Sequence, residues 1–185
     1  ESLAGYWDHY QYNFYDLQQK ADLKTLAYET KAWEDNHHRD NGEIQRYQEY
    51  IRDLASGKIS EMSRFPDYSD CFKDDFAKNY HKDISWSNPY AGFLSKRLYS
   101  ETMFETIPAS LRPEDRNTMS QSIESRSPFL DYRLVEYCFS LPNKFKIRNG
   151  LGKWILRESM KGILPENVRT RKDKSGFIAP ADEWF

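Results

Sequence analysis

The sequence predicts a mainly α-helical chain, and three observations lead to this prediction. Apolar residues recur mostly at the three- and four-residue spacing of one helix face, as in Ile44, Tyr47, Ile51 and Leu54. Almost no segment shows the strict alternation of a half-buried strand. Turn and capping residues divide the chain into pieces of helix length. The 185 residues suit one domain, or a piece of a larger one.

The first half of the chain contains two predicted helices that are bounded by polar turns. One covers residues 44–54, with a turn at 41–42 before it and Gly57 as its stop. A second, short helix is predicted over 70–78.

Two prolines shape the predicted helices in the middle of the chain. Tyr90, Leu94 and Leu98 mark a helix that Pro108 interrupts. Pro113 fits the first position of the next helix, because the fixed φ of proline suits that position and no N–H is needed there.

The third quarter of the chain predicts a helix between two prolines. Pro128 ends the preceding run, and Asp131 is a suitable N-cap. Leu134 and Cys138 lie on one side of the helix, which Pro142 closes.

The last predicted helix covers residues 151–162 and follows a turn at 148–150. Its basic residues recur every four positions and form one stripe, made of Lys153, Arg157 and Lys161. The Gly-, Pro- and Lys-rich tail at 169–185 predicts a loop.

The charge of the chain is unevenly distributed. Net charge is -2, but residues 1–110 carry 13 basic and 19 acidic side chains, whereas residues 111–185 carry 14 basic and 10 acidic ones. Residues 144–174 hold ten basic side chains against three acidic ones. Such a field attracts an anion, although a solvated basic face is the alternative interpretation.

Cysteine and histidine usage argues against disulfide and zinc scaffolds. Cys71 and Cys138 are too few and too far apart for a disulfide framework, which predicts free thiols in a reducing cytoplasm. The four histidines have no metal-ligand spacing with cysteine, and the pair at 37–38 is predicted to lie in a surface turn. No apolar run is long enough to cross a bilayer, and residues 1–20 do not form a signal peptide. The first residue is Glu1, so we expect the true N-terminus to lie upstream.

The second half carries an ordered series of motifs. "LRPEDRNTMSQSIESRSPFLDYRLVEYCFSLP" covers 111–142, "KIRNGLGKWILRESMKGILPENVRTRKDKSGF" covers 146–177, and Pro180 and Trp184 follow. Together they resemble the C-terminal synthetase domain of glutamine-dependent asparagine synthetases. "ESLAGYWDHY" at the start is similar to the sequence that follows the Gly-rich acidic motif of that family, with Glu1 as the second acid.

The resemblance implies that the chain is the helical C-terminal part of an α/β synthetase domain of the adenine nucleotide alpha-hydrolase type. It divides the chain into a variable helical region at 1–104 and a family-signature region at 105–185. The glutaminase domain of the family, with its N-terminal cysteine, and the Ser-Gly-Gly-x-Asp-Ser phosphate loop are not in this sequence. The isolated chain is therefore expected to be inactive, and whether it forms a homodimer stays open.

The resemblance also implies a reaction and its participants. The family consumes ATP with Mg, activates aspartate as an acyl-adenylate, and transfers ammonia from glutamine to it. The small-molecule partners would be ATP, aspartate and ammonia, and the remaining regions of the same protein would be the macromolecular partner.

The resemblance assigns roles to individual residues of this sequence. Lys174 in "KSGF" matches the catalytic lysine of the family, and Glu1 matches an acid beside Mg. Candidates for binding ATP or substrate are Arg116, Asn117 and Lys153. From the residues themselves, supporting roles as ion pairs or helix caps are predicted for Glu124, Arg126, Asp131 and Arg157. The first two are expected to belong to an internal ion-pair network, and the alternative is that the Glu124 carboxylate faces the acyl-adenylate.

Two other functions stay open on the sequence alone. One is a related ATP-dependent amidotransferase that acts on another carboxylate, in a sugar, an antibiotic or a peptide. The other is a non-catalytic helical interaction module, such as a nucleic-acid binder. The net charge of -2 and the lack of a basic-aromatic groove motif count against nucleic acid, and no feature indicates a membrane.

Overall fold

The computed structural model describes residues 2–37, 41–58 and 87–173, and all statements below concern these ranges. Within them the chain is mainly helical, which confirms the predicted class, and it contains no strand beyond one isolated bridge between Arg148 and Leu151. Among the helices described, none combines the length and the apolar character that a membrane crossing requires. The elements are α1 (Trp7–Gln19), α2 (Leu23–His37), α3 (Asn41–Ala55), α5 (Phe93–Met103), α6 (Thr106–Met119), η3 (Pro128–Leu130), α7 (Tyr132–Ser140), η4 (Asn143–Phe145), α8 (Trp154–Ser159) and α9 (Glu166–Arg169).

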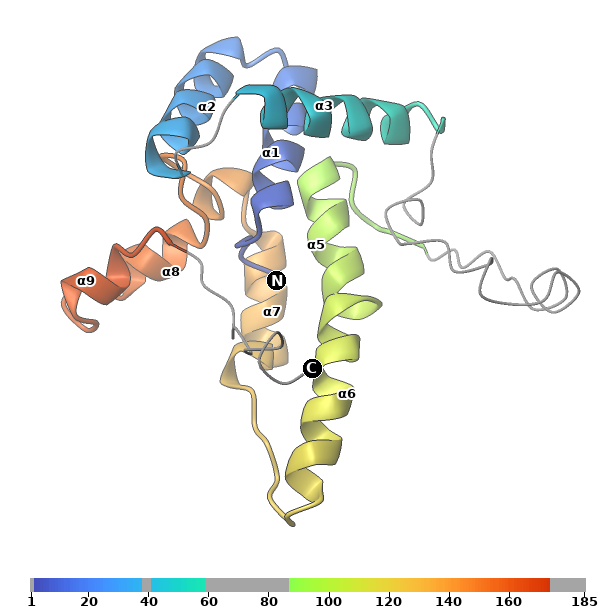
Figure 1. Ribbon diagram of the computed structural model, residues 1–185, viewed down its shortest axis with the longest axis vertical. Coiled ribbons are helices and arrows are strands. Elements are labelled where there is room, and N and C mark those ends of the chain that lie inside the picture. Colours follow the sequence, from blue (N-terminus) through green and yellow to red (C-terminus); the bar gives the residue numbers. More distant parts are fainter. Residues whose placement is uncertain (1, 38–40, 59–86, 174–185) are drawn as a thin grey trace, which may run out of the picture.

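Helix α1 is the centre of the fold. It packs against α2, α3 and α5, and the ribbon of Figure 1 shows these helices around it. Every residue from 9 to 16 is buried, because neighbours cover the helix on all sides. The core therefore combines the α1 aromatics with residues of the surrounding helices: Tyr10, Tyr12, Phe14, Tyr15, Trp33, Ile51, Leu94 and Leu98.

Buried Asp16 joins α1 to the start of α5. Its carboxylate accepts hydrogen bonds from the backbone N–H groups of Phe93 (2.7 Å) and Leu94 (3.1 Å) and from Asn143 Nδ2 (3.1 Å). The first N–H groups of a helix have no partner within the helix, and the helix dipole favours an acid at that end. Asp16 therefore fixes where α5 and η4 meet α1.

Buried Glu29 holds the predicted turn at 148–150, which the structure confirms. Its carboxylate accepts from the backbone N–H groups of Asn149 (3.0 Å) and Gly150 (2.9 Å), and Asn36 Nδ2 donates to the Asn149 carbonyl (2.8 Å). Gly150 has a φ of +66°, and a Cβ there would lie 2.6 Å from the carbonyl oxygen of Ala32. Glycine is thus required both by the left-handed backbone and by the close approach to α2.

The observed helix limits correct two of the predictions. Helix α3 begins at Asn41, so residues 41–42 belong to the helix and do not form a turn before it. Its end after Ala55, with Gly57 at φ +74°, agrees with the predicted stop. The helix predicted over 70–78 lies outside the described residues.

Helix α6 is longer than predicted. It starts at Thr106, so Pro108 lies in its first turn, where a missing N–H costs no hydrogen bond. Pro113 lies inside this helix and does not start a new one. The side chains of α6 are not buried, so its sequence pattern is not set by a core.

The prediction for α7 is confirmed. Asp131 is its N-cap and accepts from the backbone N–H of Arg133 at 3.0 Å, and the helix ends at Ser140, before Pro142. Cys138 is a free, buried thiol on its inner side, and burial raises the pKa of that thiol. Cys71 lies outside the described residues.

The prediction of a basic stripe on one long helix is wrong. Helix α8 covers only Trp154–Ser159, because Lys153 before it adopts a left-handed conformation with φ +56°. Lys161 lies beyond its end. Arg157 is therefore the one member of the predicted stripe that lies within α8.

We predict that Gly150→Ala lowers the free energy of unfolding by about 2–4 kcal/mol, since a left-handed conformation and a backbone clash add up. Gly57→Ala is the matched control: its φ is +74°, but nothing lies within 4 Å of the new Cβ, so about 1 kcal/mol is expected. Urea unfolding of both variants measures the difference. Equal losses would show that Gly150 is not held against α2.

The second prediction concerns Lys146, which is 0% exposed and whose Nζ has no hydrogen-bond partner among the described residues. Burial lowers the pKa of this amine from its ordinary value of 10.5. Protonation therefore opposes folding, a cost that is complete below the folded pKa and disappears as pH rises towards 10.5. Lys146→Met should raise the free energy of unfolding at pH 7, and this gain should shrink near pH 10.5.

Lys144→Met is the control for this second prediction. Each lysine amine lies 5.4 Å from the centroid of a phenylalanine ring, but Lys144 is exposed. Its replacement should change stability little at either pH. Urea unfolding at both pH values measures the two differences, and a pH-independent gain for Lys146→Met would contradict the assigned cause.

Candidate functional site

A cleft of about 720 Å³ opens where the start of α1 and the end of α2 face the segments around α8 and α9. Its lining includes a set of aromatic side chains and a set of cationic side chains. The aromatic side chains are Trp7, Tyr10, Trp33 and His37, and the cationic ones are Lys153, Arg157, Arg171 and Lys172. The combination suits an anionic ligand that also presents a flat or apolar part.

His37 belongs to the aromatic wall of this cleft, which corrects the prediction of a surface turn at 37–38. Its ring centroid lies 5.3 Å from that of Tyr10 and 5.8 Å from that of Trp33. Its Nε2 lies 3.1 Å from the Gly150 carbonyl oxygen. The ring therefore packs between α1 and the turn that Glu29 holds, and His38 lies outside the described residues.

Two non-glycine residues in the left-handed conformation meet at the cleft. Ala4 has φ +59° and Lys153 has φ +56°, and the backbone N–H of Lys153 donates to the Ala4 carbonyl at 3.0 Å. Such a conformation costs roughly 1–3 kcal/mol per residue and persists only where the surroundings impose it. Strain of this kind often occurs at functional sites, so it supports this wall as a site.

Glycines allow the backbone around Ala4 and the backbone around Lys153 to approach each other. A Cβ on Gly5 would lie 2.5 Å from Lys153 Cε and 3.3 Å from its Nζ, so the lysine stem lies directly on Gly5. A Cβ on Gly152 would lie 2.7 Å from the Ala4 carbonyl oxygen. The position of the Lys153 amine in the cleft therefore depends on Gly5 and Gly152.

Tyr10 connects the core to this wall. Its hydroxyl accepts a hydrogen bond of 2.7 Å from the backbone N–H of Gly152. Burial raises the pKa of the phenol, which therefore stays protonated at neutral pH. The hydroxyl proton remains available to a second partner.

Arg157 organises the basic segment beside the cleft. Its guanidinium donates to the carbonyl oxygens of Gly152 (2.9 Å), Arg169 (2.7 Å) and Arg171 (2.9 Å). The predicted role as an ion-pair partner is wrong for the described residues, since these partners are carbonyls. Burial lowers the pKa of Arg157, but a guanidinium stays protonated at neutral pH, so its charge adds to the positive field of the cleft.

Five of the predicted site residues lie away from the cleft. Arg116 and Asn117 are exposed near the end of α6. Glu124 and Arg126 form an ion pair of 2.8 Å, but their side chains are 68% and 79% exposed. The predicted internal network is therefore wrong in this chain, where an exposed pair adds little stability. Asp131 also lies apart from the cleft, as the cap of α7.

Two further predicted residues, Glu1 and Lys174, lie outside the described residues. Asp173 lines the cleft, and Lys174 follows it directly in the sequence. Ser2, which follows Glu1, is buried.

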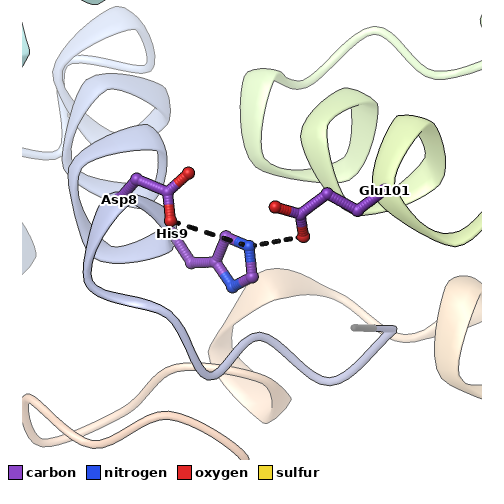
Figure 2. Close-up of side chains that lie close together, drawn as sticks. All are labelled: Asp8, His9 and Glu101. Atoms are coloured by element: carbon purple, nitrogen blue, oxygen red, sulfur yellow. Dashed lines mark hydrogen bonds and ion pairs between the residues drawn. The ribbon is translucent and has the colours of Figure 1, made fainter. Parts of the chain in front are cut away.

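The sequence interpretation missed a buried ionic network behind the cleft. Figure 2 shows His9 of α1 between the carboxylates of Asp8 and Glu101, the latter from α5. His9 Nε2 lies 2.7 Å from Glu101 Oε2, and the ring is fully buried. The four-residue spacing of Arg97 and Glu101, which suits an ion pair on one helix face, was the signal that could have indicated part of it.

The hydrogen bonds of His9 define its tautomer. Nδ1 accepts from the backbone N–H groups of Gly5 (2.9 Å) and Tyr6 (3.2 Å), so it carries no proton. The proton of the neutral ring then lies on Nε2 and is donated to Glu101. Both nitrogens of the imidazole are therefore engaged.

The network does not have the character of a metal centre, although ligand atoms of Asp8, His9 and Glu101 lie within 4.8 Å of one another. Arg97 already supplies the positive charge: it contacts Asp8 Oδ2 at 3.3 Å, Glu105 Oε2 at 2.7 Å, and Glu101 Oε1. A guanidinium bridging carboxylates is a stable arrangement without a metal. We assign these residues to a structural ion-pair network.

Comparison with known proteins identifies the family. The model of the asparagine synthase family matches residues 1–185. Glutamine-hydrolysing asparagine synthetase 1 of Bacillus subtilis (strain 168) is 41% identical over 143 residues, which cover 72% of this chain and 21% of that protein. The corresponding enzyme of Gallus gallus is 34% identical over 98 residues, or 50% of this chain and 16% of that protein.

Human asparagine synthetase is 33% identical over 98 residues, or 49% of this chain and 17% of that protein. The chain thus spans about a fifth, or less, of the length of the relatives it matches. The comparison with solved structures gives no significant match. Because the family model covers the whole chain, the chain belongs to the asparagine synthase family.

Proposed function

We propose that the chain forms part of a glutamine-dependent asparagine synthetase, an ATP-dependent carbon–nitrogen ligase of amino-acid biosynthesis. The observation that carries this proposal is the cationic cleft. Part of its lining comes from the family-signature region, around Lys153 and Arg171, and part from the start of the chain, around Gly5. The names of the matched relatives supply the substrate and the nitrogen donor.

The proposed reaction has two steps. The side-chain carboxylate of aspartate attacks the α-phosphorus of ATP, which forms an acyl-adenylate and releases pyrophosphate. Ammonia then attacks the acyl carbon and expels AMP, and the excess proton leaves the new amide of asparagine. Both transition states concentrate negative charge on oxygens, so fixed cations close to those oxygens lower the barriers.

The described residues fit the phosphates of ATP. Lys153, Arg171 and Lys172 line one cleft, and such donors suit phosphate oxygens. We propose Lys153 as a phosphate-binding residue and Lys174 as the catalytic cation that contacts the reacting phosphate. ATP would supply the activated phosphoryl group, while these residues would hold and orient its phosphates.

The described cleft lining offers fewer ligands for magnesium than for phosphate. Asp173 is the acidic side chain of the described cleft lining, and one carboxylate is a minimal ligand set. We propose Glu1 as a further ligand, because its position in the sequence matches an acid of the family's Gly-rich motif.

We propose that other regions of the same protein complete the site. A glutaminase region and a phosphate loop elsewhere in the same protein would provide ammonia and hold the rest of ATP. A cytoplasmic location fits the buried free thiol of Cys138.

We predict that Lys174→Ala in the complete synthetase lowers asparagine synthesis at least about 100-fold, as expected when one transition-state donor is lost. The loss should be the same with glutamine or free ammonia, because the defect lies after ammonia release. Glutamate formation from glutamine should persist. Asparagine, AMP and glutamate are quantified from the same reactions.

Lys161→Ala is the control for this experiment, since Lys161 is exposed and is not among the residues of the cleft. It should keep both activities. If Lys174→Ala loses glutaminase and synthesis together, or loses neither, the proposed role of Lys174 is wrong.

We also predict that the 185-residue chain alone does not convert ATP and aspartate to AMP and pyrophosphate. Its sequence contains no Gly-rich phosphate loop, whose backbone N–H groups would cradle the phosphates. Chromatographic detection of AMP over several hours tests this expectation. Aspartate-dependent AMP formation by the purified chain would show that the catalytic unit is complete without that loop.

A further inference from the structure

We propose that His9 is a positioning residue that sets the place of Lys153 in the cleft, and this inference rests on the proposed function. His9 does not line the cleft and is not a catalytic residue. It acts through segment 3–6, which Lys153 contacts and of which Gly5 lines the cleft. The close-up of Figure 2 shows the ring held between α1 and α5.

The His9 ring cannot rotate freely, because its partner Glu101 is itself held in place. Glu101 Oε2 accepts from Nε2 at 2.7 Å, and Arg97 contacts the other oxygen of the same carboxylate. Arg97 in turn reaches Asp8 and Glu105, so the carboxylate is held from several directions. All of these side chains are buried or half-buried, where hydrogen bonds to charged groups are strong.

The His9 ring also fixes two successive backbone N–H groups. Nδ1 accepts from Gly5 at 2.9 Å and from Tyr6 at 3.2 Å. Tyr6 is the N-cap of α1 and His9 is its third residue, so the ring takes the place that glutamate or glutamine holds in a capping box. The chain before α1 is thereby fixed relative to α5.

Segment 3–6 in turn contacts Lys153. The carbonyl oxygen of Ala4, whose φ is +59°, accepts from the Lys153 N–H at 3.0 Å, and Lys153 is itself left-handed. The side chain of Lys153 then lies on Gly5, whose N–H belongs to the His9 contact. A shift of segment 3–6 therefore moves both the backbone and the side chain of Lys153.

A matched feature elsewhere in the fold allows a control. Asp16 is also a buried acceptor of two successive N–H groups, those of Phe93 and Leu94. It does not line the cleft. Loss of Asp16 should destabilise the chain without moving Lys153.

The test compares His9→Leu, His9→Gln and Asp16→Asn in two assays. Leucine removes the acceptor, whereas glutamine at the third helix position can accept from the N-cap N–H. The first assay follows hydrogen exchange of the Lys153 N–H in the 185-residue chain by NMR. The second measures kcat and KM for ATP and for aspartate in the complete synthetase, per folded molecule, with ammonia as nitrogen donor.

The expected result is a selective loss in His9→Leu. Exchange at Lys153 should accelerate about tenfold, and kcat/KM for ATP should fall about tenfold, as for loss of one well-placed hydrogen bond. The KM for aspartate should stay within about twofold. His9→Gln should restore both values to within about threefold of the original protein, and Asp16→Asn should leave both nearly unchanged.

Other results overturn the inference. Unchanged exchange at Lys153, or unchanged kinetics per folded molecule, would limit His9 to general stability. The same conclusion follows if Asp16→Asn causes equal losses or if His9→Gln is as impaired as His9→Leu. If the complete original protein forms no AMP while the Lys153 exchange still depends on His9, the proposed function fails and the structural coupling stands.

Discussion

Helix α1 is buried along residues 9–16, so its polar side chains need partners from other elements of the fold. Asp16 meets this need at the start of α5, His9 between segment 3–6 and α5, and Tyr10 at Gly152. The side-chain amide of Gln11 is buried without a hydrogen-bond partner among the described residues, so not every polar side chain of α1 finds a partner there. Of these contacts, those of His9 with Gly5 and of Tyr10 with Gly152 hold the cleft-building segments against the core, whereas that of Asp16 joins helices away from the cleft.

The cleft follows from these contacts. Its aromatic wall is the edge of the core, where Tyr10, Trp33 and His37 contact one another. Its cationic wall is a stretch of loop and short helix that Arg157 holds through backbone carbonyls. The Arg157 part of this positive surface is thus fixed by hydrogen bonds to carbonyl groups, while Arg171 is ion-paired with Asp173 at 3.2 Å. Lys153 and Lys172 add their charge to the field that attracts an anion.

The residues that carry the family resemblance mostly have structural tasks in this chain. Gly150 permits the approach of the 148–150 turn to α2, Gly152 permits the approach of Ala4, and Arg157 joins three carbonyls. Asp131 caps α7. A motif can therefore identify a family dependably while only a few of its residues, such as Lys153, face the site.

The sequence by itself determined the helical class, the cap at Asp131, the turn at 148–150 and the family, because local propensity and motif order carry that information. Only the tertiary structure decided that Glu124 and Arg126 are exposed and that α8 is short. It also decided that His9 belongs to a buried network, since its partner Glu101 lies 92 residues away in the sequence. Burial and pairing depend on which distant segments meet, and a linear pattern does not contain that information.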